Sequence, residues 1–177
     1  DTIASVTGAT AGGATGSMRD YYYYNSMGVL DLDVTVLGPC RMPQNLSFYG
    51  ANQSGSDGNV RRLVQHAIMY VDTAYNLDFT QYDNDNNDTL DNVHIIFAGI
   101  PESTSGEANS IWPHKSMMYN FRGEVDGVRV HTYSCSGEKK SAGMAYGIGA
   151  MCHEFGHVLG LPDMYDVNGE EEGYSKA

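Results

Sequence analysis

The stretch HEFGHVLGLPD, residues 153–163, constrains this chain more than any other feature. Four residues advance an α-helix by about 400°, so His153 and His157 would lie on one helical face, one turn apart. Their imidazoles can then bind one ion at the distances that zinc prefers. Glu154 follows the first histidine directly, so its carboxylate points past the ion towards a water molecule whose proton it can remove. The spacing therefore predicts a metal-binding helix with a general base.

Asp163 is the predicted third ligand. Gly160 can end the helix through a positive φ, and Pro162 prevents the helix from resuming, so the chain can turn back towards the ion. Asp166 is the alternative, although the chain would have to extend further to use it. Three protein ligands leave one zinc position open, which is typical of a catalytic site, whereas a structural site normally has four. The alternative without a metal is an amphipathic helix whose histidines face solvent.

The acidic segment YDNDNNDTLD, residues 82–91, is a second candidate metal site. Oxygen donors at alternate positions of a curled loop can point inward at a hard cation. The predicted calcium ligands are the side chains of Asp83, Asp85, Asn87 and Asp91 and the backbone carbonyl of Thr89. Asp88 stands where such loops usually have glycine, although aspartate tolerates the left-handed conformation. His94 stands where an EF-hand has its glutamate, so a calcium sensor is not expected. The alternative is a solvated acidic turn without an ion.

The distribution of apolar residues predicts an α+β fold. Apolar residues recur at helical spacing over residues 57–76 and alternate as in a half-buried strand over residues 29–38. The other expected elements are a short helix over 17–27 capped by Ser17, strands over 92–99 and 128–134, and the metal-binding helix over about 146–159. Residues 1–16 and 100–126 are expected to be loops.

Several other polar residues have no clear chemical role. His66, His94 and His131 are expected to be structural. His114, in IWPHK, would either line a cleft or anchor a loop. No CxxC pair is present, so the three cysteines would form one disulfide and one thiol, or three thiols. Cys152 is expected to be a buried helix residue; the other two are Cys40 and Cys135.

Length and charge exclude some classes of protein. The chain has 177 residues, the size of one domain, and residues 1–177 are expected to form a single domain. It has 10 basic and 22 acidic residues, a formal net charge of −12, which argues against binding a nucleic-acid backbone. No apolar run approaches the roughly 18 residues of a membrane span. The acidic balance fits an exported protein or one that binds cations.

The pattern HExxHxxGxxD resembles the extended zinc motif of metzincin-type metallopeptidases, in the variant with Asp as the last ligand. More narrowly, HEFGHVLGLPDMYD is similar to the immune inhibitor A-type peptidases that bacteria secrete, as are RDYYYYNSMGVLDLDVTVLGP, YDNDNNDTLDNVHIIFAG and IWPHK. The resemblance covers roughly residues 17–166. It implies a metzincin-like zincin domain, with His153, His157 and Asp163 binding zinc and Glu154 as catalytic base. It also implies protein substrates and a secreted or cell-surface bacterial location.

The chain departs from the family pattern in two places. Such domains usually open with an apolar strand before the RDYY helix, and residues 1–16 lack that pattern. They also have a methionine turn downstream of the zinc motif, and Met164 is too close to Asp163 to form it. We therefore expect a fragment, a cleaved product or an incomplete domain, with a propeptide or a missing C-terminal segment as partner.

The predicted function is zinc-dependent endopeptidase activity. The helices over 57–76 and 146–159 would pack on a twisted mixed sheet, and a peptide would bind as an added strand in the cleft between the sheet edge and the second helix. Three alternatives are a zinc hydrolase acting on a non-peptide bond, an inactive fragment that needs a partner segment, and a calcium-dependent adhesion or interaction module with a vestigial zinc site. The intact Glu154 argues against the adhesion module.

Overall fold

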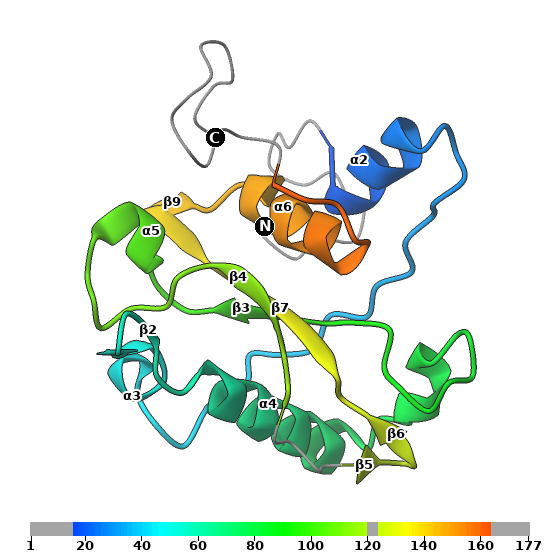
Figure 1. The fold of residues 1–177 in the computed structure, drawn as a ribbon, viewed down its shortest axis with the longest axis horizontal. Helices are drawn as coiled ribbons and strands as arrows, with labels where there is room; N and C mark the ends of the chain where they lie inside the picture. Colours follow the sequence, from blue (N-terminus) through cyan, green and yellow to red (C-terminus); the bar gives the residue numbers. More distant parts are fainter. Residues whose placement is uncertain (1–15, 120–123, 164–177) are drawn as a thin grey trace.

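A small mixed sheet with helices on both faces organises the computed structural model, which describes residues 16–119 and 124–163 (Figure 1). The α+β class is thus confirmed. The helical elements are α2 (Met18–Asn25), α3 (Leu46–Gly50), α4 (Val60–Tyr75), the 3₁₀ turn η1 (Phe79–Tyr82), α5 (Glu102–Ser105) and α6 (Ile148–Val158). The strands are β1 (Asn52–Gln53), β2 (Ser56–Asp57), β3 (Val93–Phe97), β4 (His114–Met117), β5 (Glu124–Val125), β6 (Val128–Arg129), β7 (Thr132–Gly137), β8 (Lys139–Ser141) and β9 (Met144–Ala145).

The largest sheet in the described part of the chain has the strand order β3-β7-β4. β3 runs parallel to β7, with Ile95 opposite Cys135, and β4 runs antiparallel to β7, with His114 opposite the same cysteine. β4 is therefore an edge strand. Three two-stranded hairpins, β1-β2, β5-β6 and β8-β9, lie outside this sheet.

The two faces of the sheet carry different layers. Alternate side chains of a strand point to opposite faces. Side chains of β3 and β7 pack on one face with α4 in the larger core cluster, which includes Val64, Phe97, Tyr133 and Cys135. On the other face Ile96 contacts the smaller cluster, where α2 and α6 meet. α4 and α6 accordingly lie on opposite sides of the strands in Figure 1.

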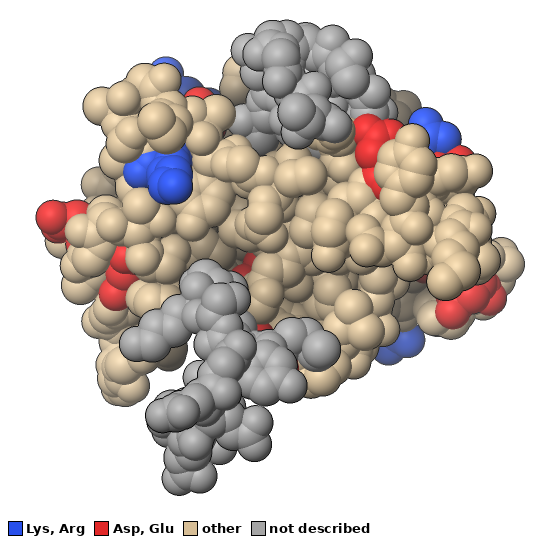
Figure 2. All heavy atoms as spheres, turned by 90° about the horizontal axis from the view of Figure 1, so that it is seen from above, with Lys and Arg blue, Asp and Glu red and all other residues tan. Residues whose placement is uncertain are grey.

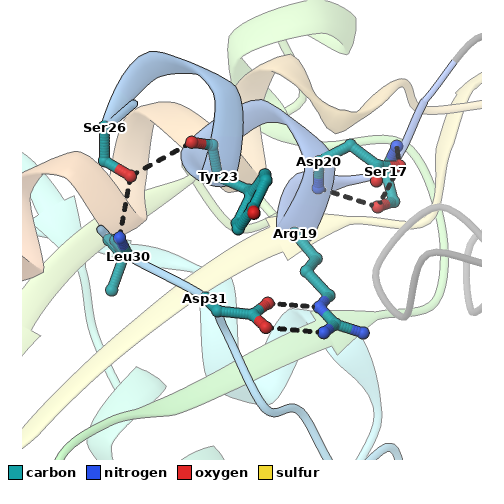
Figure 3. A network of polar contacts seen from close by, with 7 residues as sticks. All are labelled: Ser17, Arg19, Asp20, Tyr23, Ser26, Leu30 and Asp31. Carbon is teal, nitrogen blue, oxygen red and sulfur yellow. Dashed lines mark hydrogen bonds and ion pairs between the residues drawn. The ribbon is translucent and has the colours of Figure 1, made fainter. Parts of the chain in front are cut away.

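Helix α2 begins as its sequence predicts. The Ser17 hydroxyl accepts from the Asp20 N–H, while the Asp20 carboxylate accepts from the Ser17 N–H, which is a complete capping box (Figure 3). Arg19 forms a bidentate ion pair with the Asp31 carboxylate, at 2.5 and 2.7 Å. The Leu30 N–H donates to the Ser26 hydroxyl at 2.8 Å. The segment that follows α2 is thereby held against the helix.

The predicted strand over residues 29–38 is wrong. Its side chains alternate as expected, with Leu30, Leu32, Val34 and Val36 half-buried against the smaller core cluster. However, no described strand forms a ladder with this segment. Alternation reports that one face is covered, whereas a strand also requires a backbone partner.

The expectation of one irregular loop over residues 100–126 is also wrong, because α5, β4 and β5 lie within it. The predicted strand over 128–134 is two strands, β6 and β7. Asp126 and Gly127 have φ values of 54° and 89°, so they form a tight hairpin turn that pairs β6 with β5 rather than with the main sheet. The strand over 92–99 and the helix over 57–76 are confirmed, each slightly shorter than predicted.

The described cysteines are all free thiols, and Cys135 and Cys152 are buried, so the three-thiol alternative holds in this structure.

Among the described residues, no helix is both long and apolar enough to cross a bilayer. On the face seen in Figure 2, lysine and arginine side chains stand in small separate groups with acidic side chains between them.

Candidate metal centre

Helix α6 carries the HExxH residues and is held from two sides. Met151 and Cys152 are buried in the smaller core cluster. The buried Tyr22 of α2 donates its hydroxyl proton to the Cys152 carbonyl at 2.5 Å, and its ring meets Phe155 edge-on at 5.2 Å between centroids. The inner face of α6 is thus fixed by α2 and the sheet, while the histidines lie on its more open side.

The end of α6 has the geometry that the sequence predicts. Gly160 has a φ of 88°, its N–H donates to the His157 carbonyl at 3.1 Å, and the Leu161 N–H donates to the Gly156 carbonyl at 3.0 Å. These two bonds form a Schellman motif, which reverses the chain direction directly after the helix. The reversal brings Asp163 back to the histidines.

Three ligand atoms converge at this turn. The Nε2 atoms of His153 and His157 are 3.2 Å apart, and one carboxylate oxygen of Asp163 lies 3.3 Å from the first and 3.2 Å from the second. Neighbouring ligands of a tetrahedral zinc ion, at about 2.0–2.1 Å from the metal, are about 3.3–3.4 Å from one another. The spacing of the three donor atoms and their chemistry therefore fit a zinc ion. Asp166 lies outside the described residues.

A backbone carbonyl orients the second histidine. Nδ1 of His157 lies 2.8 Å from the Leu161 carbonyl oxygen, which can only accept a hydrogen bond. Nδ1 therefore carries the proton, and the lone pair of Nε2 faces the other two donors. The same turn that brings in Asp163 thus also sets the tautomer of His157.

Glu154 lies beside the donors but is far more buried, with 6% of its surface exposed. Burial is the main cause that raises the pKa of its carboxyl, to about 7, and Asp163 raises it further. A hydrogen bond from the Lys115 backbone N–H and the nearby His157 act in the opposite direction. The carboxyl therefore reaches the edge strand β4, a contact that no sequence pattern signals because it uses a backbone group.

The acidic loop also brings oxygen donors together. Carboxylate oxygens of Asp83, Asp85 and Asp91 all lie within 4.8 Å of one another. Asp83 accepts the backbone N–H groups of Asn87 and Asp88, each at 2.9 Å, and Asp88 has the left-handed φ of 60° that its position was expected to need. The calcium site stays a prediction.

Three other histidines have polar partners within the protein. Nδ1 of His66 lies 2.8 Å from the Tyr49 hydroxyl. The two ring nitrogens of His94 each lie 2.8 Å from a serine hydroxyl, those of Ser134 and Ser136. His114 is the histidine for which the sequence left two roles open. It lies at the start of β4, hydrogen-bonded to Trp112 and Tyr133.

Comparison with known proteins shows which family the chain resembles. The model of the catalytic domain of immune inhibitor A peptidase M6 matches residues 4–176. The chain is 28% identical over 175 residues to the pre-pro-metalloprotease PrtV of Vibrio cholerae serotype O1, covering 85% of this chain and 19% of the relative. It is 28% identical over 179 residues to immune inhibitor A of Bacillus thuringiensis subsp. alesti, covering 86% of this chain and 26% of the relative. The chain thus spans about a fifth to a quarter of the length of these relatives.

Proposed function

The chain belongs to the immune inhibitor A family of M6 peptidases, and from that premise we propose that it is a zinc-dependent endopeptidase domain. The proposed zinc ligands are His153, His157 and Asp163. The observation that carries the proposal is the convergence of their three donor atoms at mutual distances of 3.2 and 3.3 Å. Two imidazoles and one carboxylate satisfy the preference of zinc for nitrogen and oxygen donors and leave a coordination position open.

A zinc ion held by these residues would supply Lewis-acid chemistry, which polarises a peptide carbonyl and makes water a stronger nucleophile near neutral pH. Glu154 is the proposed general base. Its carboxylate removes a proton from the attacking water and then delivers that proton to the nitrogen of the departing amine. The carboxyl is suited to this exchange because it stands next to the donor cluster but is shielded from bulk solvent.

The sheet edge is the proposed binding site for the substrate backbone. β4 has a strand partner, β7, on one side, and α6 contacts β4 close to Glu154. An extended peptide would add to β4 through backbone hydrogen bonds, which would place a peptide bond beside the donor cluster and the water that Glu154 activates. With the active-site helix crossing a mixed sheet beside an antiparallel edge strand, we assign the domain to the zincin class, in its metzincin-like form.

The substrates would be proteins or peptides, and the chain would act outside the bacterial cell or on its surface. This location rests on the resemblance to secreted peptidases and on the acidic charge. A propeptide or a further C-terminal segment is proposed as a partner of the domain in a longer protein.

Casein hydrolysis by the purified full chain tests the proposal. We expect activity with zinc, loss of activity after treatment with 1,10-phenanthroline, and recovery when zinc is restored. A parallel assay with ester and amide substrates separates a peptidase from a zinc hydrolase of another bond. A chain that contains one zinc ion but leaves casein uncleaved contradicts the proposed function.

A further inference from the structure

Side-chain hydrogen bonds hold the start of β4 in addition to its backbone pairing with β7. β4 has only four residues and, within the described part of the chain, one strand partner, so backbone pairing alone restrains it weakly. Directly before it, both backbone groups of Trp112 are bound. The Trp112 N–H donates to Asp57 of β2 at 3.0 Å, and its carbonyl oxygen lies 2.7 Å from Nδ1 of His114.

His114 connects this corner to the neighbouring strand. A carbonyl oxygen can only accept, so Nδ1 of His114 donates to Trp112, which leaves Nε2 as the acceptor of the neutral ring. Nε2 lies 2.9 Å from the Tyr133 hydroxyl, which donates to it. The imidazole thus uses both nitrogens to join the corner before β4 to Tyr133, near the start of β7.

The far end of β4 is held separately. Nε of Arg61, on α4, donates to the Met117 carbonyl at 2.7 Å. A change at His114 should therefore loosen the start of β4 without releasing its end. Helix α6 packs against β4, and the Glu154 carboxyl lies on the side of Lys115, the residue next to His114.

We propose that His114 is a positioning residue of the peptidase. By tying Trp112 to Tyr133, it fixes the start of β4, the strand against which α6 and its Glu154 pack. The proposal rests on the proposed function, because the placement of Glu154 matters only if that residue acts as the base. Misplacement of a catalytic group by about 1 Å can cost on the order of 100-fold in rate.

Substitutions at His114 separate its two hydrogen bonds. In His114→Asn the amide nitrogen can replace Nδ1 as donor to Trp112, whereas His114→Ala loses both bonds. We expect His114→Ala to bind zinc normally, because the ligands are on α6 and its turn, but to show kcat lowered about 10- to 100-fold. His114→Asn should recover a substantial part of that loss. His131→Asn, at an exposed histidine, is the matched control and should leave kcat unchanged.

Three results would overturn the proposal: a folded His114→Ala variant with kcat within about twofold of wild type, an Asn variant no better than Ala, or a loss of zinc that parallels the loss of activity. If His114→Ala does not fold, Tyr133→Phe removes only one hydroxyl. It should lower kcat severalfold with an unchanged circular dichroism spectrum, and an unchanged kcat would equally refute the idea.

Trp112 provides a readout that does not require activity. It is the only tryptophan of the chain, so the intrinsic emission reports on this corner. We expect its spectrum to change in His114→Ala and to stay as in wild type in His131→Asn. A wild-type chain that binds zinc but cleaves nothing defeats the proposed function and leaves this spectral test standing. An unchanged emission spectrum in His114→Ala defeats the positioning role itself.

Discussion

Nε2 of His157 lies 3.2 Å from Nε2 of His153, one turn earlier on the same helix. With Nδ1 of His157 protonated towards Leu161, the lone pair of its Nε2 faces this contact. The Asp163 carboxylate approaches both nitrogens and adds negative charge. A cation placed among the three donors would stabilise all of them together, which is why the geometry favours a metal site over two solvent-facing histidines.

Glu154→Gln should abolish peptide hydrolysis while zinc stays bound. The amide retains the size of the side chain but cannot accept the proton of the attacking water, and general-base catalysis typically contributes 10²- to 10⁴-fold. Casein cleavage and zinc content are the two measurements. Glu107→Gln, at an exposed glutamate, serves as the control. Substantial cleavage by the Glu154 variant would show that another group is the base.

Asp163→Ala should lose zinc as well as activity. Removing even an outer partner of a ligand costs about 10- to 100-fold in metal affinity, so losing a ligand should cost at least as much. Zinc content after dialysis against a competing chelator is the measurement, with Asp166→Ala as the matched comparison. If Asp166→Ala loses the metal and Asp163→Ala retains it, the third ligand has been misassigned.

Tyr22→Phe tests how α2 supports the metal-binding helix. The buried hydroxyl donates to the Cys152 carbonyl, and a hydrogen bond of this kind contributes about 1 kcal/mol to stability. We expect urea unfolding to show a loss of about that size. Tyr24→Phe, on the same helix with 76% of its surface exposed, should leave stability unchanged. If Tyr22→Phe lowers the free energy of unfolding no more than Tyr24→Phe does, the hydrogen bond from Tyr22 to Cys152 does not contribute to stability.

The residues that could be predicted from the sequence depend on near neighbours in the chain. The capping box of α2, the end of α6 at Gly160 and the return of Asp163 are all set within about ten residues. Each of these features follows from one local rule. Every ligand of the proposed zinc site lies in the segment 153–163 and could be predicted in this way.

The parts that could not be predicted depend on distant partners. Residues 29–38 alternate correctly but lack a strand partner, whereas β4 has little pattern of its own and becomes a strand because β7 lies beside it. The contact of Glu154 with the Lys115 N–H joins groups 39 positions apart through a backbone atom, so residue types cannot signal it. The same holds for the bond from the Trp112 N–H to Asp57, 55 positions away.

Calcium should stabilise the chain if the acidic loop binds it. Carboxylates of Asp83, Asp85 and Asp91 already face one another, and a divalent cation would relieve their repulsion. A ligand at 100 times its Kd adds about 2.7 kcal/mol of stability. Thermal unfolding with millimolar calcium should therefore occur at a higher temperature, and Asp85→Asn, a change at an exposed ligand, should reduce the shift. No stabilisation of wild type by millimolar calcium would refute the site.

The half-buried His94 should make folding depend on pH. Its ring nitrogens lie against the hydroxyls of Ser134 and Ser136, and burial lowers its pKa from 6.5 to about 4. Between these values the unfolded chain binds a proton that the folded chain does not. The free energy of unfolding therefore falls as pH falls from 6.5 to 4 and is unaffected by this group above 6.5.

His94→Gln should flatten that part of the stability curve. At about 1.4 kcal/mol per pH unit, the histidine accounts for a loss on the order of 3 kcal/mol across the window. Asp57 and Glu154 act in the opposite direction, because burial raises the pKa of their carboxyls to about 6 and about 7, so the wild-type curve alone does not isolate His94. Urea unfolding of wild type, His94→Gln and the exposed-site control His131→Gln between pH 4 and 7.5 separates the contributions. Between pH 4 and 6.5 only the His94 variant should differ in slope from wild type, and a slope equal to that of wild type would mean that the folded protein protonates this histidine without cost.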